Sequence, residues 1–336
     1  MDVLWDTLSF AAKAGIVFLT VSATALVIFA LMRRGRRDPS GVRVKRVNDR
    51  LQRNADHVRV AVMGAKPFKK FRKRRAKQEK KAGKPTASVF VLDFRGDVVA
   101  SAVANLRQEV TALLAVAGKD DEVVVRLEST GGVMHDYGLA ASQLARFKDN
   151  EVRLTVCVDK VAASGGYMMA CVADEILAAP FAIVGSIGVA APVPNLHRLL
   201  DRHGIDYDEM TAGEYKRTVS MLAEITDKGR EKFQEQIEDA HGLFKEFIAE
   251  KRPALDLGKV ATGEYWYATR ALELGLVNRL TTSDDYLVSK LDHAQIFEVS
   301  YEKPRRLRER LAQSVSSAVV GTVIALWTRL DRARFQ

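Results

Sequence analysis

The stretch Glu122–Leu127 has the sequence EVVVRL, a short run of β-branched residues with no turn residue inside it. Two similar runs lie on either side of it, SVFVLD at Ser88–Asp93 and LTVCVD at Leu154–Asp159. Helical patterns separate the three runs, over residues 101–117 and 134–148. Continuous apolar strands that alternate with helices are typical of a mainly parallel sheet covered on both faces. The sequence therefore predicts an α/β fold.

Two further helices are expected downstream. Asp227–Lys251 has the pattern of one long, charged amphipathic helix that ends before Pro253, and Thr269–Leu274 that of a short helix ended at Gly275. We expect both to pack outside the sheet or against neighbouring subunits. The main domain is predicted over residues 85–304.

Composition excludes several classes of protein. The chain has 336 residues and 47% hydrophobic content, enough for a sizeable core, so wholesale disorder is excluded. Its two cysteines, Cys157 and Cys171, are too few for a disulfide framework or a four-cysteine zinc site. Neither a small disulfide-stapled secreted fold nor a zinc module is therefore supported.

The positive charge is concentrated in one segment. The net charge of +10 divides into −1 for residues 1–32, +17 for residues 33–84 and −6 for the remainder, because 33–84 holds 21 Lys/Arg against four acids. This segment is expected to be a basic tether. It is either a solvated, partly helical linker or a surface that adheres to anionic lipid headgroups. Nucleic-acid binding is not expected, because no stacking platform or recognised nucleic-acid fold accompanies the charge.

A membrane anchor is predicted within residues 1–32. Ala14–Met32 is a run of 19 uncharged, mostly apolar residues, about 28 Å long as a helix, and four arginines follow it closely. A cleavable signal peptide is the alternative, since Ala23-Thr24-Ala25 has the A-x-A pattern of a cleavage site. The apolar run continues past that point, and the flank before it holds Asp2 and Asp6 where a signal peptide should be basic, so we expect a retained anchor.

The C-terminal residues 305–336 are predicted to form an amphipathic helix. Their uncharged run Leu311–Trp327 has 17 residues and contains several hydroxyl side chains, which makes it short for a span. An interfacial or subunit-packing helix is therefore expected rather than a second crossing.

Two glycine-containing turns have the pattern of a site at the ends of strands. The pair Gly131-Gly132 follows one strand and precedes a helix, which lets backbone N–H groups approach a ligand closely. Ser164 follows another strand among Ala162, Ala163, Gly165 and Gly166. A serine there is usually a helix N-cap, but such small neighbours also suit an accessible nucleophile, with the Gly165 N–H ready to stabilise an oxyanion.

A nucleophilic serine needs a base, and the supply of histidines is poor. His135, three residues after Gly132, is the histidine kept as a candidate. A lysine can serve instead when burial lowers its pKa from about 10.4 to near 7, at a cost of about 4.6 kcal/mol. Lys216 fits this role only if its neighbours Glu214 and Arg217 point elsewhere.

At four separated motifs the chain resembles the signal peptide peptidase A family of Ser/Lys serine peptidases. The motifs are the Gly131-Gly132 turn, AASGGYMMA around Ser164, GSIGV at Gly185–Val189 and GEYKR around Lys216, in the family's order. The resemblance covers roughly residues 88–285. The single anchor and basic tether are similar to a single-domain branch of the family in the bacterial inner membrane.

The resemblance implies a membrane-anchored serine endopeptidase that cleaves unfolded peptides, such as residual signal peptides or membrane-protein fragments. Ser164 would be the nucleophile and Lys216 the general base, with Ser186 orienting the lysine. N–H groups of Gly165, Gly131 and Gly132 would form the oxyanion hole. The resemblance implies no metal and no cofactor.

The resemblance also implies the Clp protease and crotonase type of fold, built from repeated ββα units, and assembly into a homo-oligomeric ring. One departure concerns the first turn, where Thr130 occupies a position that is commonly proline in the family, so the turn is expected to be less rigid.

Two other functions stay open on the sequence. A crotonase-type acyl-CoA enzyme would use a similar oxyanion hole without a serine nucleophile, and a non-catalytic membrane scaffold would keep only the fold. The side of the membrane is also open. Basic residues after the span favour a cytoplasmic domain, whereas the family's association with exported signal peptides favours the periplasm.

Overall fold

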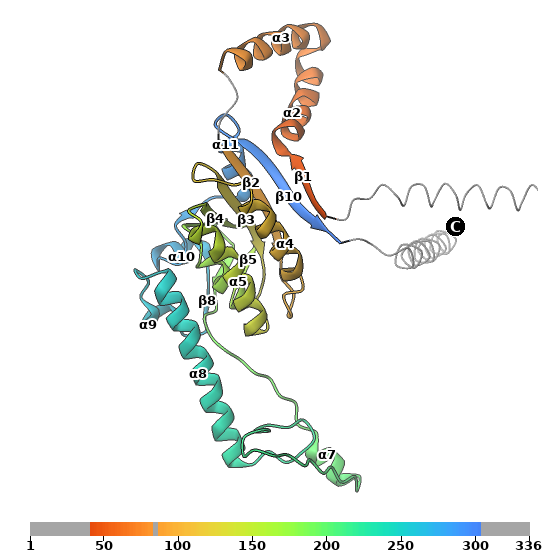
Figure 1. The fold of residues 1–336 in the computed structure, drawn as a ribbon, viewed down its shortest axis with the longest axis vertical. Helices are drawn as coiled ribbons and strands as arrows, with labels where there is room; N and C mark the ends of the chain where they lie inside the picture. The colour runs from red at the N-terminus through yellow and green to blue at the C-terminus, as the bar shows by residue number, and fades with distance from the viewer. Residues whose placement is uncertain (1–40, 83–86, 304–336) are drawn as a thin grey trace, which may run out of the picture. The chain divides into compact units, whose positions relative to one another are not determined.

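A seven-stranded sheet forms the centre of the protein (Figure 1). The computed structural model describes residues 41–82 and 87–303. From β10 to β9 every neighbouring pair is parallel. In spatial order the strands are β1 (Gly41–Arg46), β10 (Gln295–Glu302), β2 (Ser88–Arg95), β3 (Glu122–Glu128), β4 (Arg153–Val158), β6 (Glu175–Ala178) and β9 (Arg279–Leu280).

A second, three-stranded sheet carries the short strands. Its order is β5–β7–β8, with β5 parallel to β7 and β7 antiparallel to β8. Ser129, just beyond β3, forms a parallel bridge with Ala162 of β5, and this bridge joins the two sheets. The strands of this second sheet are β5 (Val161–Ala163), β7 (Ile183–Gly185) and β8 (Tyr265–Tyr267).

Helices cover both faces of the main sheet. One buried cluster packs α4, α5 and α6 against strand residues such as Val125 and Val156, and the other packs Tyr286 and Leu287 of α11 against Val124. The helices of the main domain are α4 (Val103–Leu114), α5 (Met134–Asp149), α6 (Gly165–Ala170), α7 (His197–Arg202), α8 (Asp227–Lys251), α9 (Leu257–Val260), α10 (Ala268–Glu273) and α11 (Ser283–Lys290).

The predicted α/β class is confirmed, and so are the strands and helices on which it was based. The long helix α8 has the predicted bounds, and Thr226 caps it by accepting a hydrogen bond from the Gly229 N–H. Phe244 and Ile248 near its C-terminal end are buried against the core. In Figure 1 the helix runs away from the sheet, and α7 lies near its N-terminal end.

The segment expected as a tether contains regular structure. Residues 41–46 form β1 at the edge of the sheet, and two helices follow, α2 (Val47–Met63) and α3 (Ala65–Ala82). The predicted anchor at 1–32 and the predicted C-terminal helix at 305–336 lie outside the described residues, as do residues 33–40 and 83–86. Among the residues that the structure describes, no helix has both the length and the apolar composition needed to cross a membrane.

Candidate active site

Ser164 lies at the junction between β5 and α6, in a backbone conformation that is rare for a residue with a side chain. Its φ is +52° and its ψ is −121°, and its N–H donates to the Gly185 carbonyl at 2.8 Å. Holding a non-glycine residue there costs about 1–3 kcal/mol, and such residues concentrate at functional sites. Although Ser164 occupies the N-cap position, its side chain makes no capping hydrogen bond. The half-buried hydroxyl is therefore free for other chemistry.

The Gly131-Gly132 turn lies directly against Ser164. Beyond β3, Ser129 is held on β5 by two backbone hydrogen bonds, with Val161 at 2.9 Å and Ala163 at 3.0 Å. A Cβ added to Gly131 would lie 2.7 Å from the Ser164 Cβ, so only glycine fits at this position, where φ is +87°. The structure thus brings together two motifs that lie about 30 positions apart in the sequence.

The N–H groups of the three predicted oxyanion residues differ in their partners. The Gly131 N–H donates to the Ser129 Oγ at 3.1 Å. Within the described part of the chain, the N–H groups of Gly132 and Gly165 have no hydrogen-bond acceptor. Gly165 is the first residue of α6, where the N–H groups of a helix lack intrahelical partners.

A chain of hydrogen bonds connects the Gly131-Gly132 turn to Tyr137 of α5 and to the backbone of Asp97. Burial raises the pKa of the Tyr137 phenol, which stays protonated and donates to the Asp97 carbonyl at 2.8 Å. The Ser129 hydroxyl must then donate to the Tyr137 oxygen, 2.6 Å away, and accept from the Gly131 N–H. Sequence reasoning missed Tyr137, because a tyrosine in the first turn of an amphipathic helix is usually an ordinary core residue.

Ser186 lies beside Ser164 at the end of the neighbouring strand. Ala163 of β5 pairs with Gly185 of β7, so the two serines follow adjacent parallel strands. Ser186 has the same positive φ, +52°, and its N–H donates to the Glu264 carbonyl at 2.7 Å. Its hydroxyl donates weakly to the Gly263 carbonyl at 3.4 Å.

Lys216 is not among the residues brought together around Ser164. It is exposed, in a stretch between α7 and α8 that has no regular structure, and its N–H donates to the Gly213 carbonyl at 3.1 Å. Its neighbours do point elsewhere: Glu214 pairs with Lys228, and Arg217 pairs with Glu209 at 3.0 Å. The Lys216 ammonium has no ion pair with any described residue.

The other candidate nucleophiles and bases are poorly placed. His135 has a side chain that is 84% exposed, with Asp136 as its partner at 3.9 Å. Both cysteines are free and buried, and burial raises the pKa of the Cys171 thiol to about 12, so neither is a reactive thiolate. The described residues contain no group of three or more His, Cys, Asp or Glu side chains arranged to hold a metal ion.

Comparison with known proteins identifies the family. The model of peptidase family S49 matches residues 146–296, and the model of the S49 N-terminal region matches residues 2–144. The chain is 50% identical over 246 residues to a probable protease SohB of Haemophilus influenzae, covering 73% of this chain and 70% of that protein. The chain belongs to peptidase family S49. Ser164, Ser186 and Lys216 all lie within the part matched by the main S49 model.

Other relatives extend the match along the chain. A probable protease SohB of Buchnera aphidicola subsp. Schizaphis graminum is 42% identical over 304 residues, with 87% of each chain covered. The chain is thus a SohB-like member of family S49, and this membership supports a peptidase. Among solved structures, a mutant of the membrane-bound stomatin-specific protease 1510-N matches with a TM-score of 0.43 and 11% identity, over 64% of this chain and 98% of that one.

Proposed function

We propose that this S49 peptidase is a serine endopeptidase in which Ser164 is the nucleophile. The observation that supports it best is the strained, uncapped Ser164 at a strand-to-helix junction. A capping serine would have its hydroxyl engaged with the helix, and an ordinary turn residue would not need this conformation. The crotonase-type alternative needs no serine at this position, so it does not account for the strained backbone of Ser164.

The oxyanion hole would be formed by the N–H groups of Gly165 and Gly132. Both lack acceptors among the described residues; Gly165 directly follows Ser164, and Gly132 follows Gly131, which packs against the serine. Gly131 would contribute by its small size, because its own N–H is used by Ser129. In the reaction the Ser164 Oγ would attack the scissile carbonyl, and these donors would stabilise the negative oxygen of the tetrahedral intermediate.

Lys216 would act as general base and Ser186 would orient it. The lysine would take the proton of the Ser164 hydroxyl, return it to the leaving amine, and later activate the water that hydrolyses the acyl-enzyme. A lysine must be neutral to do this, and burial favours the neutral form. Since Lys216 is exposed in the single chain, we propose that a second copy of the chain brings it to Ser164.

A surface for such a second copy is available in the Lys216 segment. None of residues 190–226 is buried, and large apolar side chains are exposed along it. Exposed apolar groups that gather in this way usually mark an interaction site. They are Val193, Leu196, Leu199, Ile205, Tyr207, Met210, Tyr215 and Met221. Assembly into a homo-oligomeric ring would cover these apolar side chains and would bury Lys216 at the same time.

The proposed substrates are unfolded peptides near a membrane, such as residual signal peptides or membrane-protein fragments. The support is the uncharged run at residues 14–32, which would anchor the peptidase in the bacterial inner membrane. Folded proteins are poor substrates for a serine enclosed within a ring. No cofactor or metal takes part in the proposed chemistry.

The nucleophile can be tested by reaction of the full-length protein with a fluorophosphonate probe. The Ser164 Oγ should form the bond to phosphorus as fluoride leaves, and Ser164→Ala should abolish both labelling and cleavage of an unfolded polypeptide. Ser142→Ala, which changes an exposed helical serine, is the matched control and should keep both. Undiminished labelling of Ser164→Ala would disprove the assignment.

The base is tested separately by Lys216→Arg and Lys216→Ala. Arginine keeps the positive charge but stays protonated, so both variants should be inactive at every pH examined. His135→Ala should cost little activity. Substantial hydrolysis by Lys216→Arg would show that Lys216 has an electrostatic role only, and a large loss in His135→Ala would favour a histidine base.

A further inference from the structure

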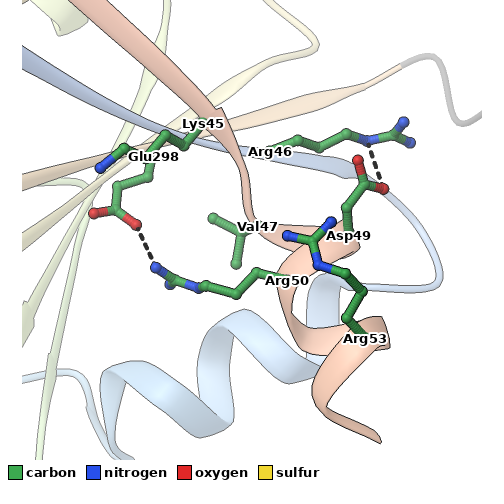
Figure 2. A pocket seen from close by; sticks show the side chains of 7 residues that line it. All are labelled: Lys45, Arg46, Val47, Asp49, Arg50, Arg53 and Glu298. Atoms are coloured by element: carbon green, nitrogen blue, oxygen red, sulfur yellow. Dashed lines mark hydrogen bonds and ion pairs between the residues drawn. The ribbon is translucent and has the colours of Figure 1, made fainter. Parts of the chain in front are cut away.

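The basic segment that precedes the peptidase core is fixed to the sheet at its root. β1 pairs with β10 at the sheet edge, and Val47, the first residue of α2, is buried. The Asn48 side chain donates to the Ala294 carbonyl at 3.1 Å and accepts from the Ile296 N–H at 2.7 Å. Its neighbour Arg50 pairs with Glu298 of β10 at 3.0 Å, as Figure 2 shows. The root of α2 therefore cannot swing freely relative to the sheet.

Figure 2 also shows that the root is rich in cations. A shallow pocket between β1, α2 and β10 is lined by Lys45, Arg46, Arg50 and Arg53 against two acids. This pocket is at the edge of the sheet. In the strand order, β10 and β2 separate β1 from β3, the strand that leads to the Ser164 site, so the pocket is no part of the candidate active site. In the described chain, Lys45 and Arg53 have no ion-pair partner.

The helices α2 and α3 form a hairpin, here named the basic arm (residues 47–82), that is closed by side chains. Asp56 of α2 accepts hydrogen bonds from Arg59 at 2.8 Å and from Arg75 of α3 at 3.0 and 3.3 Å. Both guanidinium groups lie over the Phe71 ring, 5.2 and 5.9 Å from its centre. These contacts hold α3 against α2 as a folded unit rather than a loose tether.

The arm presents a dense positive charge on its outer helix. The 18 residues of α3 include ten Lys/Arg and a single acid. The exposed cations Lys66, Lys69, Lys70 and Lys73 have no ion pair with any described residue. So many like charges repel one another, and an anionic surface would relieve that repulsion.

The bend between the two helices adds exposed apolar side chains. Val62 is 81% exposed and Met63 is 42% exposed, next to Gly64, where α2 ends. Val58, one turn before Val62 on the same face of α2, is 63% exposed. Apolar side chains beside a cluster of lysines and arginines are typical of elements that lie in a membrane interface.

We propose that the basic arm docks on an anionic lipid bilayer, with the cations of α3 at the headgroup phosphates and Val62 and Met63 entering the interface. The distance along the chain supports a membrane as the partner. Eight residues separate Met32, the end of the predicted span, from β1, and fully extended they reach at most about 28 Å. Because the arm is fixed to β10, docking would hold the peptidase domain in one orientation over the membrane surface.

Nucleic acid fits the same surface less well. Single-stranded nucleic acid binds to aromatic side chains on which bases stack. Phe68 and Phe71 of α3 are only half-buried, yet Phe71 is already covered by two guanidinium groups. The exposed side chains at the bend are aliphatic, which suits acyl chains rather than bases.

The proposal can be tested with full-length protein reconstituted in vesicles. Both native cysteines are buried, so Val62→Cys can be labelled selectively with an environment-sensitive fluorophore. In vesicles containing phosphatidylglycerol, the fluorophore should shift to the blue and be quenched by brominated lipid roughly twofold more than in pure phosphatidylcholine, with the difference lost at high salt. A fluorophore at Val116→Cys, which is 70% exposed in the main domain, is the control and should not respond.

Two variants separate a folded arm from a flexible basic tether. A triple change of exposed α3 lysines to Glu should remove the fluorescence response. The three residues are Lys69, Lys70 and Lys73. Asp56→Asn makes the segment more positive but removes the carboxylate charge that pairs with Arg59 and Arg75, so a folded arm predicts a weaker response, whereas a flexible tether predicts an equal or stronger one. Ser164→Ala should leave the response intact, which keeps this test independent of peptidase activity.

Three results would overturn the proposal. They are equal responses in the two kinds of vesicle, a response at position 116 equal to that at position 62, and an undiminished response in Asp56→Asn. Tighter binding of the arm to an oligonucleotide than to anionic vesicles, at the same salt concentration, would assign the surface to nucleic acid instead.

Discussion

At the scale of single residues, a network of buried contacts supports the turn beside Ser164. The hydrogen-bond chain from Gly131 through Ser129 and Tyr137 to Asp97 fixes the turn beside Ser164, the proposed nucleophile. The Tyr137 ring also lies under Gly165, where an added Cβ would come within 2.4 Å of the ring. Tyr137 thus contacts Gly165 directly and reaches Gly131 through Ser129, so we propose that it is a positioning residue.

We expect Tyr137→Phe to lower kcat about tenfold, or about 1.4 kcal/mol, with a smaller change in KM, because the loss of both hydrogen bonds of the phenol, with Ser129 and with the Asp97 carbonyl, would misplace the oxyanion donors. Steady-state kinetics with a peptide substrate measure this. Tyr167→Phe is the matched control, since the Tyr167 hydroxyl donates to the Leu276 carbonyl at 2.9 Å and not to the turn. Equal losses of kcat in the two variants would reduce Tyr137 to a purely structural role.

Single residues also show which parts of the candidate site could be predicted from the sequence. Ser164, Gly131 and Gly132 could be selected because small residues at strand ends are visible in the sequence. The positive φ at Ser164 and Ser186 could not be foreseen, because it follows from the pairing of β5 with β7 and from contacts distant in the chain. Whether Lys216 meets Ser164 is also beyond sequence reasoning, since in the proposed enzyme it depends on an assembly.

At the scale of elements, a buried carboxylate joins α11 to the sheet. Glu122 at the start of β3 accepts hydrogen bonds from Thr155 of β4, Tyr286 and Lys290, at 2.5, 2.5 and 2.8 Å. Burial alone would raise the pKa of Glu122, but the hydrogen bonds from Lys290, Thr155 and Tyr286 outweigh it, and the pKa lies below its ordinary value. The ionised form is therefore the one that the folded protein favours.

This lowered pKa predicts a dependence of stability on acid. Glu122 stabilises the fold above its unfolded pKa, near 4.3, and the contribution is lost as pH falls through the lower folded value. We expect Glu122→Gln to lose about 2 kcal/mol at pH 7 and to show a flatter decline of Tm in acid. Thermal melts from neutral to acidic pH measure this. Glu128→Gln, which breaks an exposed pair with Lys160, should melt like the wild type at each pH, and identical profiles for Glu122→Gln would contradict the expectation.

Sequence patterns predicted the elements of the core well and those of the edge poorly. The buried strands β2, β3 and β4 have continuous apolar runs, and α8 has clear start and stop signals. β1 has the sequence GVRVKR, whose alternation of valine and cation suits an edge strand, but the basic composition around it favoured a linker. The three-residue strands β5, β7 and β8 are too short to show any period.

At the scale of the whole molecule, the active site is proposed to require more than one copy of the chain. Ser164 lies in the packed core unit, whereas Lys216 lies in a segment that buries none of its own residues. An enzyme divided in this way has activity only when assembled. Dilution below the dissociation constant of the assembly should then abolish turnover without unfolding the chain.

Complementation provides a direct test. Ser164→Ala and Lys216→Ala should each be inactive alone, but after joint refolding or subunit exchange a serine from one variant can meet a lysine from the other. Random mixing of equal amounts should restore about a quarter of the wild-type activity, as one interface in four would carry both groups. Failure to recover activity in mixed assemblies would place the dyad within one chain. Mixing Ser164→Ala with the wild type in the same ratio controls for dilution.

The pairing of β1 with β10 has a practical consequence for anyone who shortens the chain to obtain a soluble form. Removing the basic segment as if it were a dispensable leader, and starting near Ser88, would strip the outer edge of β10 of its partner. A bare strand edge offers unpaired N–H and C=O groups to other molecules and promotes aggregation. The cut would also open the apolar cluster that Val47 closes. A shortened protein should therefore begin no later than Gly41. If a form that begins after Gly41 is insoluble, the exposed edge of the sheet would be the cause, rather than the lack of a membrane.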